Sequence, residues 1–94
     1  MANVVITERA ANDIDTILSS VIEFTGFETS GIRLFEEFAE KFDIIGFMPT
    51  IGRVREEDGT RETFARNYRI IYEEKDNIVY ILTVIHCSRL YPSK

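Results

Sequence analysis

Residues 68–86 read YRIIYEEKDNIVYILTVIH, and this stretch decides how the chain folds. Both ends of it are rich in β-branched and aromatic residues, while the central KDN segment is suited to a turn. The second run, residues 78–86, is almost continuously apolar, which is typical of a strand that is buried on both faces. We therefore expect a hairpin whose second strand lies in the middle of a sheet.

Further strands are expected on both sides of this hairpin in the sequence. Residues 61–65, RETFA, have a strand-forming composition, and residues 49–60 before them are rich in turn-forming proline and glycine. Near the start of the chain, residues 3–7, NVVIT, form a short β-branched run. The sequence thus predicts one strand at its beginning and three towards its end.

A first amphipathic helix is expected over residues 8–24. Thr7 can cap it, because the threonine hydroxyl can accept a hydrogen bond from a backbone N–H of the first turn. Gly26 suits the end of the helix, where a left-handed residue is common. Apolar residues at spacings of three and four form the predicted core face, namely Ala10, Ile14, Ile17, Val21 and Phe24.

A second helix is expected to begin at about Ser30 or Gly31 and to be ended by Gly46 and Pro49. A short loop joins it to the first helix, so the two should form an antiparallel hairpin. The helical period again predicts the core face, which consists of Ile32, Phe35, Phe38, Ala39, Phe42 and Ile45.

These elements predict one domain that spans residues 1–94, since the chain is too short for more. The expected fold is of the α+β class, in the order β-α-α-β-β-β. The helix hairpin should pack its phenylalanine-rich faces on one side of a mostly antiparallel sheet.

The charge of the chain counts against broad binding of nucleic acid. The formal net charge is −5, whereas proteins that grip a phosphate backbone are usually basic. The acidic excess lies in residues 1–48, with three basic and nine acidic side chains, while residues 49–94 carry eight basic and seven acidic ones. We therefore expect no strong nucleic-acid binding by the chain alone, although its second half can still hold a local basic patch.

Composition also narrows the cellular setting. We expect no membrane association, because no apolar stretch approaches the length of a membrane span and the first residues do not resemble a signal peptide. The single cysteine, Cys87, excludes an internal disulfide and fits a reducing cytoplasm. We expect Cys87 to be a small, partly buried apolar residue.

Only one arrangement of residues suggests catalysis. Neither a metal site nor a cysteine nucleophile is expected, because His86 and Cys87 are single and strand neighbours point to opposite faces. A metal-independent ribonuclease needs a general base, an acid and cations for the phosphate, and the chain offers suitable types. The candidate set is Arg69, His86, Arg89 and Tyr91. Structural roles for the same residues are the competing interpretation.

Five arginines between positions 53 and 69 could bind phosphates or an acidic protein segment. Acidic residues are interleaved with them and cancel much of the positive field, so a salt-bridged loop is an equally weighted alternative. The arginines are Arg53, Arg55, Arg61, Arg66 and Arg69, and the interleaved acids are Glu56, Glu57, Asp58 and Glu62.

The order of elements and a set of spaced residues resemble the ParE branch of the RelE/ParE toxin superfamily. Residues 6–21 are similar to the end of the family's first strand and its first helix, and the spaced residues of the second half complete the pattern. These are Pro49, Gly52-Arg53, Arg55-Glu56, Gly59, Arg61, Tyr68, Ile70, Tyr72, Asp76, Val84, His86 and Arg89.

The resemblance implies a cytoplasmic toxin of a type II toxin–antitoxin system that binds and poisons DNA gyrase. It also implies a hetero-oligomer with a cognate antitoxin, no cofactor and no enzymatic activity of the toxin itself. The implied target-binding candidates are Arg53, Arg55, Arg61, Arg69, His86, Arg89 and Tyr91.

Two alternatives stay open. RelE-like relatives cleave mRNA on the ribosome, and an inactive homologue would bind only the antitoxin. RelE-type toxins are strongly basic and carry lysines where this chain has residues 60–63, TRET, so the acidic balance favours the ParE branch. In the RelE-like case the catalytic residues would be Arg69, His86, Arg89 and Tyr91.

Overall fold

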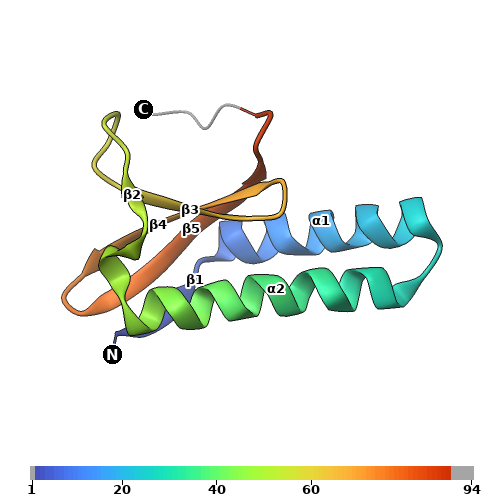
Figure 1. Ribbon diagram of the computed structural model, residues 1–94, viewed down its shortest axis with the longest axis horizontal. Helices are drawn as coiled ribbons and strands as arrows, with labels where there is room; N and C mark the ends of the chain where they lie inside the picture. Colours follow the sequence, from blue (N-terminus) through green and yellow to red (C-terminus); the bar gives the residue numbers. More distant parts are fainter. Residues whose placement is uncertain (1, 90–94) are drawn as a thin grey trace.

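Two long helices pack side by side on one face of a five-stranded sheet in the computed structural model, which describes residues 2–89 (Figure 1). The α+β class and the predicted order β-α-α-β-β-β are confirmed, with one additional two-residue strand. The elements are β1 (Asn3–Ile6), α1 (Glu8–Thr25), α2 (Glu28–Phe47), the 3₁₀ helix η1 (Pro49–Ile51), β2 (Arg53–Val54), β3 (Arg61–Ala65), β4 (Tyr68–Lys75) and β5 (Ile78–His86).

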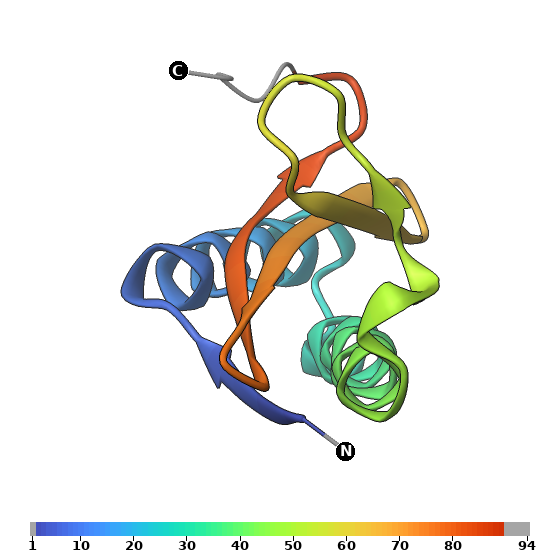
Figure 2. The same cartoon turned by 90° about the vertical axis from the view of Figure 1, so that its left-hand side faces the viewer.

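The sheet has the strand order β1-β5-β4-β3-β2 (Figure 2). The β1 strand runs parallel to β5, while every other neighbouring pair is antiparallel. The helix hairpin and the strands β2 to β4 lie between β1 and β5 in the chain, so this pair is not joined by a tight turn and can run parallel. The prediction of a mostly antiparallel sheet is therefore confirmed.

The hairpin of β4 and β5 forms as its composition predicts. Asp76 and Asn77 occupy the turn with φ angles of 55° and 64°. Aspartate and asparagine tolerate this left-handed conformation, which suits the twist of a two-residue hairpin turn. The pairing register shifts between Ile71 and Tyr72, so that Ile71 faces Thr83 but Tyr72 faces Ile81. This bulge changes which β5 side chains point to the helices.

Helix α1 has the predicted ends. The Thr7 side chain accepts a hydrogen bond from the backbone N–H of Ala10 at 3.2 Å, and Gly26 ends the helix with φ 78°. Phe24 was predicted to belong to the core face, and this is wrong because its side chain is 92% exposed. Phe24 keeps the helical register of the core face, but the hairpin end projects beyond the sheet and leaves it nothing to pack on (Figure 1).

Helix α2 begins at Glu28, two residues before the earliest predicted start. Its buried face includes Leu34, Phe38, Phe42 and Ile45, while Ile32 and Phe35 are 56% and 45% exposed. The predicted core face therefore included two residues that are exposed, Ile32 and Phe35, and omitted the buried Leu34. Gly31 allows the close approach of α1, since an added Cβ would lie 2.7 Å from Ile22.

Helix α1 also closes the edge of β5 that β1 leaves open. The β1 strand pairs with β5 only over residues 78–81. Beyond that point, the Thr7 hydroxyl donates to the Ile81 carbonyl at 2.7 Å. The Asp13 carboxylate accepts from the Val84 backbone N–H at 3.2 Å and from the Thr83 hydroxyl. A side-chain carboxylate thus replaces the backbone acceptor of a missing strand.

The segment predicted as turns, residues 49–60, contains η1 and β2. Tyr72 of β4, whose ring is fully buried, holds this segment against the sheet through its hydroxyl group. The Tyr72 hydroxyl accepts from the Gly52 N–H at 2.8 Å and donates to the Pro49 carbonyl at 2.8 Å. Burial raises the pKa of the Tyr72 phenol, since the charged phenolate would be poorly solvated there.

Two predictions about the end of the chain need correction. The β5 strand is interior, between β1 and β4, but its two faces differ in burial. Tyr80 and Ile85 are only half-buried on the face away from the helices, because no second layer of helices covers it. Cys87 was expected to be partly buried and is exposed instead, one residue beyond the strand.

Among residues 2–89, no helix is long and apolar enough to span a membrane.

Candidate functional site

The two faces of the sheet separate the candidate residues. Alternation along β4 directs Tyr68 and Ile70 towards the helices, where both pack in or against the core. Arg69 and Ile71 point to the opposite side, which we call the outer face. The pairing of Phe64 with Arg69, and of Glu62 with Ile71, puts these β3 residues on the outer face as well.

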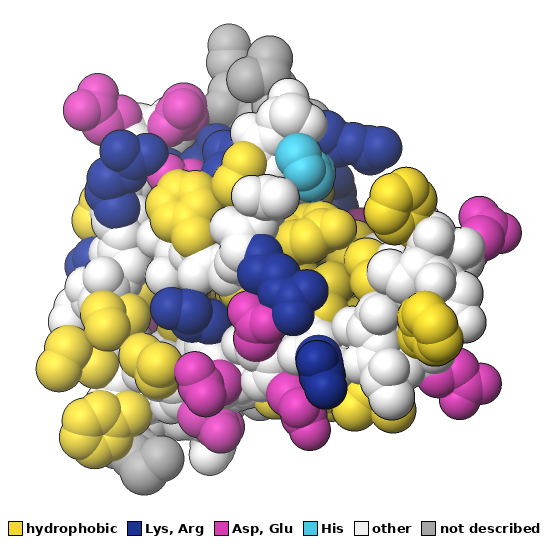
Figure 3. Space-filling view, turned by 45° about the vertical axis from the view of Figure 1, so that its right-hand side comes forward, with side chains coloured by type: hydrophobic (Ala, Val, Ile, Leu, Met, Phe, Trp, Pro, Cys, Tyr) yellow, Lys and Arg dark blue, Asp and Glu magenta, His cyan; other side chains and the backbone are white. Residues whose placement is uncertain are grey.

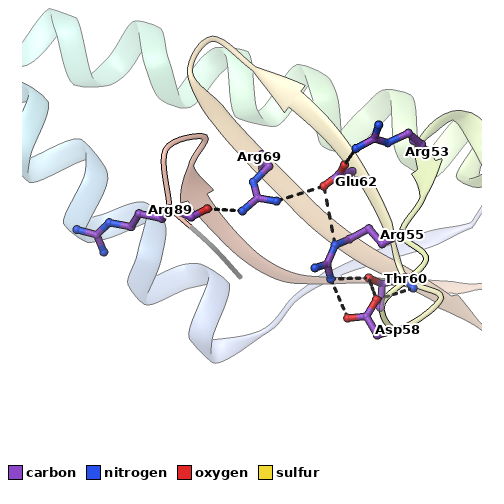
Figure 4. A network of polar contacts seen from close by, with 7 residues as sticks. All are labelled: Arg53, Arg55, Asp58, Thr60, Glu62, Arg69 and Arg89. Carbon is purple, nitrogen blue, oxygen red and sulfur yellow. Dashed lines mark hydrogen bonds and ion pairs between the residues drawn. The ribbon is translucent and has the colours of Figure 1, made fainter. Parts of the chain in front are cut away.

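Glu62 lies at the centre of an ion-pair network on the outer face (Figure 4). Its side chain is only 4% exposed. One carboxylate oxygen binds Arg53, and the other lies 3.5 Å from Arg69 Nη1 and 3.9 Å from Arg55 Nε. The hydrogen bond to Glu62 raises the pKa of the Arg53 guanidinium further above its ordinary value. A buried carboxylate is tolerable here because cations surround it.

The loop between β2 and β3 supplies the second part of the network. The Arg55 side chain is 4% exposed and donates to Asp58 at 2.7 Å and to the Thr60 hydroxyl at 3.4 Å. Asp58 in turn accepts from the Thr60 hydroxyl and backbone N–H at 2.6 and 3.0 Å. These hydrogen bonds from Thr60 hold the pKa of the Asp58 carboxyl below its usual value, against the opposing effect of burial. Gly59 permits the turn with φ 77°.

Arg69 joins the network to the end of β5. Its Nη2 donates to the backbone carbonyl of Arg89. Its Nε is buried and finds no hydrogen-bond partner among residues 2–89. Beside Arg69 lies a cavity of about 580 Å³, which we call the arginine pocket. It is lined by Arg53, Val54, Arg55, Glu56, Glu57, Glu62 and Arg69.

His86 lies on the helix-facing side of the sheet. Its ring meets the Tyr68 ring edge-on, with centroids 5.6 Å apart, and Tyr68 meets Phe38 in the same way at 5.7 Å. His86 Nδ1 lies 2.7 Å from the Ser88 hydroxyl oxygen. A second cavity, of about 460 Å³, separates this end of β5 from α1 and is lined by both His86 and Arg89.

The remaining candidates are dispersed. Arg61 donates to the carbonyls of Thr50 and Gly52 at 3.2 and 2.8 Å, so it anchors η1 rather than joining the network. Tyr91 lies outside the described residues. Arg66 pairs with Glu37 of α2, away from the arginine pocket.

The structure therefore brings Arg53, Arg55 and Arg69 together but separates them from His86. Tyr68 pairs with His86 and Arg69 pairs with Ile85, so the imidazole and the Arg69 guanidinium point to opposite faces. Within residues 2–89, no group of three or more potential ligands is placed to hold a metal ion. The described part of the site is suited to recognition of a charged partner rather than to proton transfer.

Sequence reasoning named the arginines of this site but missed the role of Glu62, which it treated as one of several interleaved acids. A usable signal was present. Residues 61–65 alternate in a predicted strand, so Glu62 and Phe64 share a face, whereas Arg61 and Thr63 occupy the other. An acid at a strand position, flanked by arginine-rich neighbours, is a candidate for a buried ion pair.

Comparison with known proteins agrees with this geometry. Residues 4–91 match the family of ParE toxins of type II toxin–antitoxin systems, parDE. The chain is similar to the chromosomal ParDE toxin–antitoxin system from P. aeruginosa, with a TM-score of 0.81 and 21% identity over 92% of this chain and 96% of that one. It is also similar to the toxin–antitoxin complex RelBE2 from Mycobacterium tuberculosis, with a TM-score of 0.53 and 26% identity over 90% and 96%. No curated protein matches the sequence.

Proposed function

The chain belongs to the ParE toxin family of type II toxin–antitoxin systems, and from this membership we propose that it binds and poisons DNA gyrase. In this proposal the protein acts by recognition, stabilises the cleaved complex of gyrase with DNA, and performs no chemistry of its own. A cognate antitoxin binds it and keeps it inactive. Both partners are cytoplasmic proteins, and the exposed free thiol of Cys87 is compatible with that reducing compartment.

The observation that carries this choice is the separation of the arginines from His86. A ribonuclease needs cations for a phosphate and a general base within reach of the same phosphate. Here Arg69 lies on the outer face with Arg53 and Glu62, and His86 lies on the other face of the sheet. This arrangement favours a binding protein over the RelE-like alternative.

A second observation supports the antitoxin as partner. Large apolar side chains are exposed along the helix hairpin and around η1, and Figure 3 shows hydrophobic side chains in separate groups, at the lower left and at the right, with charged side chains between them. Phe24, Phe27 and Phe47 are each at least 68% exposed. Exposed aromatic side chains are typical anchors for an amphipathic segment that folds on binding. We propose that the antitoxin covers these surfaces and forms a hetero-oligomer with the toxin.

Supercoiling assays with purified gyrase test the proposal. The protein should inhibit supercoiling and increase the amount of cleaved DNA, and addition of the antitoxin encoded beside it should reverse both effects. mRNA incubated with the protein and translating ribosomes should stay intact, for the wild type and for His86→Ala and Arg69→Ala alike. Absence of any effect on gyrase at large molar excess would contradict the proposal.

Induced expression separates the remaining alternatives. A gyrase poison should stop growth and produce filamentous cells, because replication is blocked while cell mass increases. A ribosome-dependent nuclease should stop growth with cleaved mRNA. A homologue retained only to bind antitoxin should leave growth unchanged, so normal growth with confirmed expression of folded protein would also contradict our proposal.

A further inference from the structure

We propose that the arginine pocket on the outer face binds a single carboxylate side chain, presented by a peptide segment of a protein partner. This inference concerns the ligand of the pocket and holds for any partner that supplies such a segment. It rests on the unsatisfied hydrogen-bonding capacity of Arg69, on the shape of the pocket and on its charge.

Arg69 has incomplete hydrogen bonding. Its Nη1 lies 3.5 Å from Glu62, a long contact, and its Nε has no partner within residues 2–89. Within the same residues, its Nη2 donates to the neutral carbonyl of Arg89. The Nε–H and one Nη2–H of a guanidinium point in the same direction and together match the two oxygens of a carboxylate. An incoming carboxylate can therefore take the place of the Arg89 carbonyl and satisfy both groups.

The pocket provides room and flanking contacts for such a ligand. The cavity of about 580 Å³ borders Arg69 and also Arg53, whose side chain is 77% exposed at its opening. Val54 lines the same cavity and is 49% exposed, and Phe64, paired with Arg69 across the strands, is 45% exposed. A carboxylate in the pocket would thus have apolar surfaces beside it for the neighbouring residues of a peptide.

The charge of the network favours one additional carboxylate. Among residues 2–89, the guanidinium groups of Arg53 and Arg69 both form their ion pair with one acid, Glu62. One more negative charge would complete the pairing in a site where Arg55 and Glu62 are already buried.

A polyphosphate fits the same site poorly. Glu56 and Glu57 line the cavity, so successive phosphates of a nucleic acid would meet carboxylates as well as arginines. The net charge of −5 adds an unfavourable field for any long polyanion. The pocket is therefore suited to an acidic side chain of a peptide and not to a nucleic-acid backbone.

Titration of the isotopically labelled protein with blocked five-residue peptides tests this inference. One peptide carries a single central glutamate between leucines, and its matched control carries glutamine. The glutamate peptide should shift the side-chain Nε–H resonance of Arg69 in a saturable way, and the glutamine peptide should not. Equal shifts with both peptides, or no shift with either, would overturn the inference.

Substitutions then locate the site. Arg69→Lys keeps a positive charge but removes the paired donors, and it should weaken binding of the glutamate peptide by about tenfold or more. Arg66→Lys is the matched control, because Arg66 pairs with Glu37 outside the pocket, and it should bind like the wild type. Unchanged affinity in folded Arg69→Lys protein would refute the assignment.

Two further measurements keep the test decisive. If Arg69→Lys does not fold, Arg53→Gln replaces it, since the Arg53 side chain is largely exposed. This substitution should weaken binding of the glutamate peptide severalfold. Unchanged affinity would contradict the assignment of the pocket. An oligothymidylate should compete poorly with the glutamate peptide. Tighter binding of the oligonucleotide to the same arginines would assign the site to nucleic acid instead. None of these results depends on gyrase, so this inference and the proposed function can fail separately.

Discussion

The two faces of the sheet differ in the kind of side chain that they carry, although both are formed by the same strands. On the helix-facing side, Phe38 and Tyr72 belong to the apolar core, Tyr68 packs against it, and the buried Tyr72 phenol is hydrogen-bonded. On the outer face, the buried Glu62 and the partly buried Arg69 are joined by an ion pair. The comparison indicates that the helix-facing side provides most of the stability, whereas the outer face carries the ion-pair network for which we propose a role in recognition.

The helix-facing side should show the largest loss of stability on truncation. Phe38→Ala removes a fully buried ring that packs on Tyr68, and we expect the free energy of unfolding to fall by about 4 kcal/mol. Phe35→Ala, nearly one turn away on the same helix and 45% exposed, should lower it by roughly 1 kcal/mol. Urea unfolding followed by circular dichroism measures both. Similar losses for the two variants would show that the sheet does not form the core described above.

The outer face should be sensitive to the loss of its central acid. Glu62→Gln removes the buried carboxylate that Arg53 and Arg69 contact, and we expect the free energy of unfolding to fall by about 3 kcal/mol. Glu37→Gln is the control, because it breaks a partly exposed pair with Arg66 and should change stability by less than about 1 kcal/mol. Chemical denaturation of both variants provides the measurement. A Glu62→Gln protein as stable as the wild type would mean that the network contributes nothing to folding.

Tyr72 tests whether a polar group on the helix-facing side contributes through its hydrogen bonds. Tyr72→Phe should lower the free energy of unfolding by about 2 kcal/mol at neutral pH, since the Gly52 N–H and the Pro49 carbonyl lose their partner. The raised pKa of Tyr72 means that the folded protein retains the phenolic proton longer than the unfolded chain does. Its contribution is therefore complete below the unfolded pKa and declines as the pH rises towards the folded pKa. Denaturation between pH 8 and 11 should show this decline in the wild type and a weaker one in Tyr72→Phe.

The smallest effect should come from Asp58, at the margin of the outer-face network. Its lowered pKa, caused first by the Thr60 hydroxyl, means that its contribution is present above the unfolded pKa and is lost as the pH falls through the folded value. We expect this contribution to be less than about 1 kcal/mol, because the pair with Arg55 is partly exposed. Unfolding measured from pH 6 to pH 2 should show a shallower acid decline in Asp58→Asn. An identical decline in both proteins would show that the Asp58 carboxylate does not contribute to the stability of the fold.

Much of the fold was predictable because local patterns decide it. The cap at Thr7, the end at Gly26 and the turn at Asp76 and Asn77 each depend on the chemistry of a few neighbouring residues. The helical faces were predicted less well, since periodicity shows which side of a helix is apolar but not how far the sheet extends beneath it. Phe24 shows the consequence, with a side chain in the correct register beyond the end of the sheet.

The candidate site was predictable in its residue types and not in its arrangement. The sequence indicates a cluster of arginines with interleaved acids, and five of those side chains do form one network. The placement of His86 on the opposite face follows from the pairing of β4 with β5, which the sequence does not specify to within one residue.

Most of the elements, their order and the resemblance to a toxin family could be read from the sequence, because periodicity, turn chemistry and spaced motif residues are all local in the chain. That Asp13 closes the edge of β5 and that Glu62 contacts three arginines became evident only in the folded structure. These contacts join residues of different elements, up to 71 positions apart. Their geometry depends on strand register and on how the helices lie across the sheet, and both emerge only when the whole chain has folded.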